Sequence, residues 1–231
     1  AGYVAIRMVG ARAGILLTGV LGGLASSTAS TLAFSRRSRE EPALSEHYAL
    51  AVVAACTVML PRVLIATGLV NRHFALSLVV PFALMAIPGI GYAAWVWLRR
   101  HPRRRQGDTP ALGNPLSLAT AIKFAALYSL VAFAVKAIQA EGWTQGLLPL
   151  SFVSGLTDMD AISLSIARDH GTEKATPDLA ARAVVLAAVS NTLLKTGISV
   201  ALGSPGLKAR IGIVLGATAI VGVAWMLTAS S

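Results

Sequence analysis

The sequence predicts an all-α fold, a polytopic transmembrane helix bundle of about seven helices built from two parallel-oriented repeats. Three observations support this prediction. Of the 231 residues, 55% are hydrophobic and only 13% are charged, whereas a soluble domain is about a quarter charged. The hydrophobic residues fall in long blocks, each near the ~20 residues that a helix needs to cross a bilayer. Two polar strings inside these blocks also repeat at a constant spacing of 132 residues.

Seven apolar blocks give the predicted helices in chain order. They cover residues 13–34, 48–70, 74–98, 115–138, 146–167, 180–202 and 209–229. The blocks are continuously apolar, whereas the strands of a membrane barrel alternate polar and apolar residues. A soluble helical protein is the alternative, but seven such blocks leave too little polar surface for it. We therefore expect an integral membrane protein.

The two polar strings are copies of one unit. The first covers residues 22–31 (GGLASSTAST) and the second covers residues 154–163 (SGLTDMDAIS). At the offset of 132, Gly10, Gly14, Gly23, Leu24, Ala29, Leu32 and Arg36 match Gly142, Gly146, Gly155, Leu156, Ala161, Leu164 and Arg168. Such internal similarity predicts a duplicated unit. We assign repeat one to residues 1–105 and repeat two to residues 106–231, within a single membrane domain.

The number of helices in each repeat sets the expected symmetry. Residues 1–9 look like the tail of a helix whose full counterpart is the block 115–138, so the first helix of repeat one is expected to be truncated. Four helices per repeat is an even number, and the two repeats would then enter the membrane in the same direction. The pseudo-twofold axis would lie along the membrane normal. An odd number of helices would reverse this expectation.

Basic residues give the formal net charge of +10 and concentrate at the ends of the blocks. This placement follows the positive-inside rule, and it argues against binding of nucleic acid. Loops 35–47, 99–114 and 168–179 carry ten Lys and Arg residues, and loops 70–74, 139–145 and 203–210 carry three. The first set is therefore predicted to be cytoplasmic, and the C-terminus with it, in a multi-pass protein of the bacterial inner membrane.

Two carboxylates lie inside an apolar block. Eight of the ten acidic residues fall in loops, and the other two are Asp158 and Asp160. A carboxylate at mid-bilayer costs on the order of 3 kcal/mol or more, so it is usually retained for a reason. It either binds a cation or proton, or pairs with a basic residue to fix the bundle. Residues at i and i+2 do not share a helix face, so the two side chains point to different neighbours or the helix is interrupted near Gly155 and Thr157.

The first polar string carries hydroxyls where the second carries these carboxylates. Ser26 and Thr28 align with Asp158 and Asp160. If the strings face each other, they form a set of oxygen donors, which hard cations such as Mg²⁺, Ca²⁺ or Na⁺ prefer. The set is Ser26, Ser27, Thr28, Ser30, Thr31, Thr157, Asp158, Asp160 and Ser163, with Asp158 and Asp160 as the candidate metal ligands. Gly22, Gly23 and Gly155 are expected at the helix breaks, although small residues also serve simple helix packing.

Two basic residues also lie within apolar blocks. Arg62 follows Pro61, and Lys195 lies in the equivalent block of the second repeat. We expect one of them to neutralise Asp158 or Asp160, and a cation or proton to displace that pairing during transport. Asn191, one turn before Lys195, adds a polar contact on the same face. A purely structural ion pair is equally consistent with the sequence.

These motifs resemble the C-terminal membrane domain of many bacterial proteins of the MgtC/SapB family. The matching segments are Gly10–Gly14, Gly22–Thr28, Arg62, Asn114-Pro115, Ser154–Ala161 and Lys195. The resemblance spans nearly the whole chain and implies a multi-helix membrane domain without an established activity. It also implies a complete helix before Tyr3. The link of MgtC proteins to magnesium limitation belongs to a different domain and only mildly favours divalent cations here.

Three functions are compatible with these features. The first is a cation transporter or channel whose site lies between the repeats. The second is a membrane protein that transports nothing and regulates a partner, with the buried carboxylates in structural ion pairs. The third is an intramembrane enzyme using Asp158 and Asp160 as acid and base. No nucleophile or metal set accompanies them, so we expect no enzyme. We expect the bilayer and a small cation as partners, no cofactor, and small-residue faces that would permit a homodimer.

Overall fold

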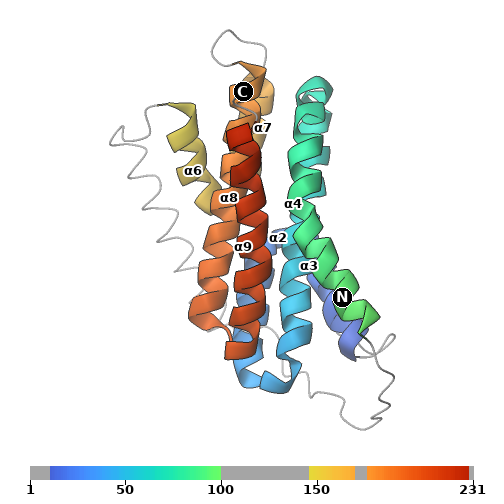
Figure 1. Ribbon diagram of the computed structural model, residues 1–231. Coiled ribbons are helices and arrows are strands. Elements are labelled where there is room, and N and C mark those ends of the chain that lie inside the picture. The colour runs from blue at the N-terminus through green and yellow to red at the C-terminus, as the bar shows by residue number, and fades with distance from the viewer. Residues whose placement is uncertain (1–10, 100–145, 170–175, 229–231) are drawn as a thin grey trace.

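The computed structural model describes residues 11–99, 146–169 and 176–228. Its elements are α2 (Ala11–Glu40), the short 3-10 helix η1 (Pro42–Leu44), α3 (Ser45–Val70), α4 (Arg72–Leu98), α6 (Leu147–Thr157), α7 (Met159–Asp169), α8 (Pro177–Leu202) and α9 (Pro205–Thr228). Every regular element in these ranges is helical, which confirms the all-α bundle (Figure 1). The predicted helix over 115–138 lies outside the described residues.

Polar and proline residues set the helix boundaries. The Asn71 side chain accepts a hydrogen bond from the Phe74 amide, so it caps α4 just after α3 ends. Thr176 caps α8 in the same way, and Pro177 occupies its first turn, where its missing N–H costs nothing. α4 contains Pro81 and Pro88 and bends along its course (Figure 1), as internal prolines predict.

α2 is broken at Ser26 and turns back on itself. Ser26 has extended backbone angles (φ −161°, ψ 106°) within the helix. Before the break, Gly19 packs on Ala51 and Gly23 packs on Ala55, so the first half of α2 runs in the same direction as α3. After the break, Ser27 contacts Met59, and Phe34 stacks on a ring near the start of α3. α2 therefore enters the bundle, reverses at Ser26 and leaves by the end it entered.

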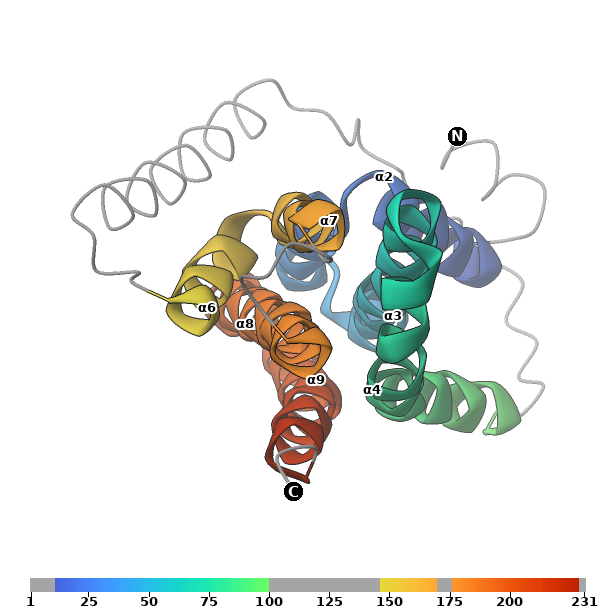
Figure 2. The same cartoon turned by 90° about the horizontal axis from the view of Figure 1, so that it is seen from above.

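The second repeat contains the same hairpin. α6 ends at Thr157, Asp158 is extended (φ −144°, ψ 92°), and α7 begins at Met159. Asp158 stands 132 residues after Ser26, so both repeats break at the equivalent position. In the view from above, α7 overlies part of α2 (Figure 2). The interruption predicted from the sequence is confirmed, one residue beyond the expected segment.

The two repeats are inverted rather than parallel, so that part of the prediction is wrong. α3 and α8 occupy equivalent positions in the repeats but run in opposite directions (Figure 1). Ser45 at the start of α3 bonds to Ser204 just past the end of α8. Asn71 past the end of α3 bonds to the Ala167 carbonyl, near the start of α8. Each hairpin adds no crossing of its own, so the expectation that every apolar block crosses the membrane, from which the parallel orientation was derived, is wrong for the described residues.

The inversion also changes which loops share an end of the bundle. Residues 35–46 contact residues 199–210 at what we call the lower end, placed at the bottom of Figure 1. Residues 70–74, the end of α7 and the C-terminal end of α9 lie at the opposite, upper end. The loop grouping from which the sequence predicted a cytoplasmic C-terminus is therefore wrong.

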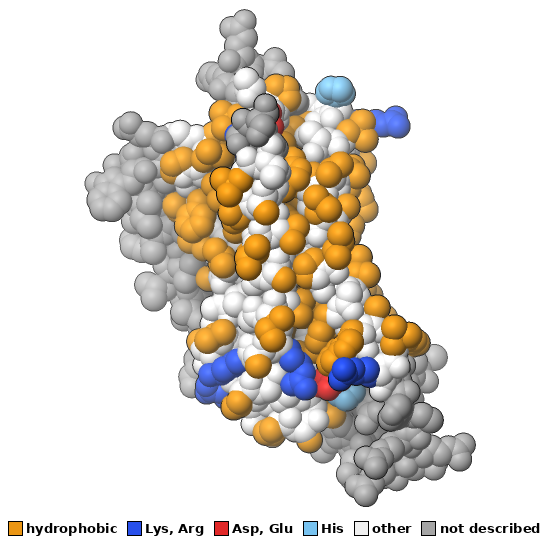
Figure 3. Space-filling view, viewed as in Figure 1, with side chains coloured by type: hydrophobic (Ala, Val, Ile, Leu, Met, Phe, Trp, Pro, Cys, Tyr) orange, Lys and Arg blue, Asp and Glu red, His pale blue; other side chains and the backbone are white. Residues whose placement is uncertain are grey.

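The helices are long and apolar enough for a membrane. By length and composition, five of the described helices could span a bilayer: α2, α3, α4, α8 and α9. α2 is the exception in geometry because it reverses at Ser26. Large apolar side chains remain exposed along α4 and α9, for example Leu76 and Ile213. They form the apolar surface between the ends in Figure 3, as expected for contact with lipid.

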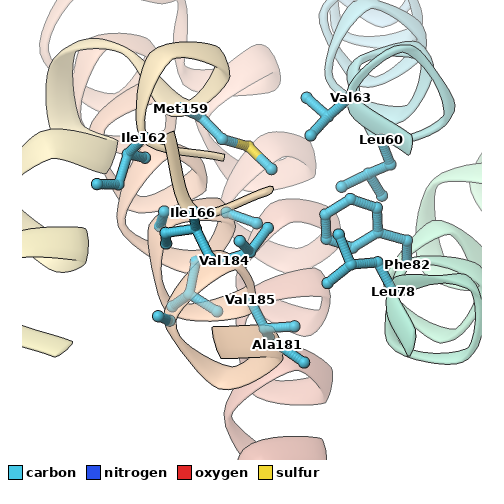
Figure 4. Packing of buried hydrophobic residues seen from close by; sticks show 14 of the residues in the cluster. Leu60, Val63, Leu78, Phe82, Met159, Ile162, Ile166, Ala181, Val184 and Val185 are labelled. Carbon is cyan, nitrogen blue, oxygen red and sulfur yellow. The ribbon is translucent and has the colours of Figure 1, made fainter. Parts of the chain in front are cut away.

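The core joins the repeats to each other. Leu60 and Val63 of α3 and Phe82 of α4 face Ile166 of α7 and Val184 of α8 (Figure 4). All five side chains are buried to at least nine-tenths. Helices of both repeats, including α7 of the second hairpin, therefore share one packed core.

Candidate functional site

A cavity of about 280 Å³ lies where the two hairpin breaks meet. It is lined by Ala25, Ser26, Ser27, Thr28, Met59, Arg62, Thr157, Asp158, Met159, Asp160 and Asn191. These residues come from both polar strings and from the helix that follows each hairpin. Eight of them were predicted from the sequence as site residues. The expectation that the two strings face each other is therefore met in the structure.

Ser26 and Asp158 each cap the second half of their hairpin. Ser26 Oγ accepts a hydrogen bond from the Ala29 amide at 3.2 Å, and Asp158 Oδ1 accepts one from the Ala161 amide at 3.0 Å. Such caps satisfy amides that have no partner within the helix. The positive end of the α7 dipole also stabilises the negative charge of Asp158. One oxygen of Asp158 is thus committed to the backbone, and the side chain still lines the cavity.

Arg62 connects the first hairpin with the second. Its Nη1 donates to the carbonyls of Gly23 at 3.4 Å and Leu24 at 2.9 Å, which end the first half of α2. Its Nη2 forms an ion pair with the Asp160 carboxylate of α7. The expected ion pair is therefore found between Arg62 and Asp160, whose side chain is 40% exposed. The guanidinium also satisfies carbonyls that a helix end leaves without partners.

Asn191 plays the corresponding part in the second repeat. Its Nδ2 donates to the Gly155 carbonyl of α6 at 2.8 Å. Its Oδ1 is buried and has no hydrogen-bond partner among the described residues. The side chain is 3% exposed and lines the cavity. Because Nδ2 must be the donor to the Gly155 carbonyl, the group left without a partner is an acceptor oxygen, and a buried acceptor of this kind is costly to leave unmet.

Lys195 lies behind the cavity wall. Its side chain is fully buried, and Nζ is 2.8 Å from the sulfur of Met59. Ser27 Oγ approaches the same sulfur at 3.5 Å. No ion pair joins Lys195 to an acidic residue in the described part of the chain. Lys195 is therefore not the group that neutralises Asp160, and it does not line the cavity.

Three further predicted oxygens have local roles. Thr31 donates to the Ser27 carbonyl at 2.8 Å, and Ser163 donates to the Met159 carbonyl at 2.7 Å. Both side chains are buried, and neither lines the cavity. Thr157 does line it and also donates to its own helix at Ser154. The cavity brings together the oxygens around the breaks and leaves out those one turn further along.

The glycines of the two polar strings pack helices together and do not form the breaks. A Cβ added at Gly23 would lie 2.5 Å from Cα of Ala55, and one at Gly155 would lie 2.5 Å from the carbonyl oxygen of Ala187. These two contacts are equivalent at the offset of 132. The breaks lie three residues later in each repeat, and a Cβ at Gly22 would meet only the flexible hydroxyl of Ser30. The expectation that Gly22, Gly23 and Gly155 make the breaks is wrong.

Sequence reasoning missed Ala25, Met59 and Met159. Each is an apolar residue within an apolar block, so none gave a polar signal. Met59 could have been found, because it aligns with Asn191 at the offset of 132. The structure places both of these residues on the cavity wall, on α3 and α8.

The cavity offers oxygen donors rather than a cluster of strong metal ligands in the described residues. No group of three or more His, Cys, Asp or Glu side chains with metal-binding geometry occurs within 11–99, 146–169 and 176–228. The oxygen-bearing side chains that line it include two carboxylates, the Asn191 amide and the hydroxyls of Ser27 and Thr28. Hard cations bind such oxygens and retain part of their water when protein ligands are few.

The chain matches, over residues 1–203, the family model described as a domain of unknown function (DUF4010). All residues that line the cavity fall within this match. The chain is similar to an uncharacterized protein of Aquifex aeolicus (strain VF5), with 33% identity over 198 residues that cover 84% of each chain. No solved structure matches. Neither match carries the name MgtC/SapB, so that resemblance stays a prediction.

Proposed function

This chain belongs to the DUF4010 family, and from the site itself we propose that it transports a small cation across a bacterial inner membrane. The observation that carries the proposal is the cavity at which two hairpins of opposite orientation meet. In transporters with inverted repeats, substrate sites lie near the bilayer midplane at the repeat interface, where helices are broken. Irregular backbone at that depth is tolerated where it lines a cavity or is buried in protein.

The side chains of the cavity favour a cation over an anion. Asp158 and Asp160 line the cavity together with a single guanidinium, that of Arg62. Arg62 is already engaged by Asp160 and by two backbone carbonyls. Asn191 Oδ1 adds an acceptor without a partner. An anion would have to displace these carboxylates, whereas a cation completes the oxygen set.

We further propose that the lower end of the bundle faces the cytoplasm. The described basic residues at this end are Arg36, Arg37, Arg39, Arg99, Lys208 and Arg210, and a band of them is visible in Figure 3. Basic residues accumulate on the cytoplasmic side. The C-terminal end of α9 would then be extracytoplasmic, which reverses the expectation from the sequence.

A second candidate is a membrane protein that regulates a partner and transports nothing. The ion pair between Arg62 and Asp160 favours it, because a closed pair of this kind can serve the fold alone. The two candidates differ in whether Asp158, which is in no ion pair in the described residues, can be neutralised without loss of function.

The experiment is cation flux into proteoliposomes, measured with Na⁺, K⁺, Mg²⁺ and Ca²⁺ for the wild type and for Asp158→Asn and Asp160→Asn. Asn at position 158 keeps an oxygen that can cap α7, so the substitution removes the charge and preserves the cap. Asp178→Asn is the matched control, because Asp178 pairs with Arg182 at the start of α8, outside the cavity.

Transport is supported if one cation enters wild-type vesicles and the Asp178→Asn variant, but not vesicles with folded Asp158→Asn. The absence of flux for all four ions, or unchanged flux in both cavity variants, would contradict the proposal. Folding of each variant is checked by circular dichroism and by elution in size-exclusion chromatography.

A further inference from the structure

Lys195 is a buried lysine for which the described residues provide no carboxylate partner. The ion pairs of the described chain are Arg62 with Asp160, Arg182 with Asp178 and Arg210 with Glu46. Lys195 is instead fully buried on α8, and its Nζ contacts the thioether of Met59. A thioether is a weak acceptor and offers no counter-charge. Burying an ammonium without a counter-charge is costly.

A lysine differs from an arginine in how it can respond to this cost. A buried lysine can release its proton and become a neutral amine, whereas a guanidinium keeps its charge. Arg62 and Lys195, the two basic residues between the repeats, differ in whether they can lose their charge. Arg62 has a permanent charge and a carboxylate partner, whereas Lys195 has a removable charge and no carboxylate partner among the described residues.

The position of Lys195 connects its charge with the cavity. It lies on α8 one helical turn after Asn191, and its Nζ contacts Met59, which lines the cavity. The charged and titratable groups that act on it electrostatically are Cys56 and Arg62 of α3 and Asp160 of α7. In the weakly polarisable interior, charges separated by one side chain still interact strongly. A cation in the cavity and a proton on Lys195 therefore oppose each other.

We propose that Lys195 is a proton-binding site and that the protein exchanges its cation for a proton. This inference rests on the cation transport proposed above. With Lys195 protonated, Arg62 and Lys195 balance Asp158 and Asp160. When a cation enters the cavity, an N–H bond of the ammonium breaks, its electron pair stays on Nζ, and the proton passes to water. The bound cation then carries the charge that the proton supplied.

The exchange also fixes a charge balance that can be measured. One monovalent cation exchanged for one proton moves no net charge across the membrane. One divalent cation exchanged for one proton moves a single positive charge. Because the cation and the proton on Lys195 compete, the apparent affinity for the cation should rise with pH in the wild type. Removal of the amine should abolish this pH dependence.

The test uses the full chain in proteoliposomes that contain a pH-sensitive dye, with each of Na⁺, K⁺, Mg²⁺ and Ca²⁺ added outside. Cation uptake and internal pH are recorded together for the wild type, Lys195→Met and Lys195→Arg. Met keeps the length of the side chain without the amine, and Arg keeps a charge that cannot be released. Lys208→Met, in the first turn of α9 at the lower end, is the matched control.

We expect cation uptake with proton release in the wild type and in Lys208→Met. Lys195→Met should take up the cation without moving protons, and its uptake should not depend on pH. Lys195→Arg should neither take up the cation nor move protons. Cation uptake without proton movement in the wild type, or unchanged exchange in Lys195→Met, would overturn the inference and leave cation transport standing. No uptake of any cation would overturn both.

A second readout does not depend on transport or on the stability of a variant. Purified wild-type protein in weakly buffered detergent should release protons when the transported cation is added. Binding of that cation without proton release would overturn the proposal, even if the Lys195 variants failed to fold.

Discussion

Adding one methyl group at Gly155 should loosen the contact between α6 and α8. A Cβ at this position would lie 2.5 Å from the carbonyl oxygen of Ala187 and 2.6 Å from its Cα. Non-bonded carbon contacts are optimal at about 3.5–4.0 Å, so the helices must separate by roughly 1 Å. The obstructing atoms are backbone, which cannot rotate away as a side chain could. Overpacking of this kind costs about 1–3 kcal/mol.

The assay is thermal unfolding of Gly155→Ala in detergent, followed by helical circular dichroism. For a chain of this size, 1 kcal/mol corresponds to roughly 2–4 °C in Tm, so Tm should fall by about 2–12 °C. Gly197→Ala is the matched control on α8, because its Cβ would meet nothing within 4 Å. There the loss of a helical glycine should stabilise by roughly 0.5–1 kcal/mol.

The repeat relation supplies an independent check on this reasoning. Gly23→Ala would bring its Cβ to 2.5 Å from Cα of Ala55 and should destabilise by a similar amount. If Gly155→Ala and Gly23→Ala melt at or above the temperature of Gly197→Ala, the close approach is refuted. The hairpins would then not be held against α3 and α8 by these glycines.

Three other predictions concern the site and the topology. Arg62→Met and Asp160→Asn should each lower Tm. The double variant should lose less stability than the two single variants together, with a coupling of about 0.5–3 kcal/mol in a double-mutant cycle. Strict additivity would refute the ion pair. Asp158→Ala should lose about 1 kcal/mol of stability through its missing cap, while Asp158→Asn keeps most of it, as thermal melts would show; equal losses would refute the cap. Cysteines introduced at Glu40 and Ala209 should react with an impermeant maleimide from the same side of the membrane. A cysteine at the C-terminal end of α9 should react from the opposite side. Labelling of all three cysteines from one side would refute the inverted arrangement.

Much of this fold could be predicted from sequence because the signals were local. Apolar blocks gave the helices, and the constant offset of 132 gave two related units with a break in each. The cavity followed from polar residue types in those units, since hydroxyls and carboxylates rarely lie within apolar blocks without a partner. Asp160 therefore indicated an ion pair, although the choice of Arg62 over Lys195 depended on distances that a sequence does not contain.

The inverted orientation could not be predicted because it depends on where a chain turns. A block of about 22 apolar residues fits a single crossing and fits a hairpin of two half-length helices equally well. Ser26 and Asp158 are the residues at which each chain reverses, and either could also cap a helix without reversing it. Mistaking each hairpin for a crossing changed the parity of the repeat and therefore the assignment of loops to the two ends of the bundle.

The hydrogen bonds at the two breaks have a consequence for how the protein is made. The carbonyls at the first break are bonded by Arg62 of α3, and Gly155 at the second break is bonded by Asn191 of α8. In each case the partner lies on the helix synthesised directly after the hairpin. Each hairpin can thus satisfy its broken backbone, which lipid cannot do, as soon as the next helix leaves the ribosome. Insertion of the first repeat does not have to wait for the second, whereas the contact between Arg62 and Asp160 forms only when both are present.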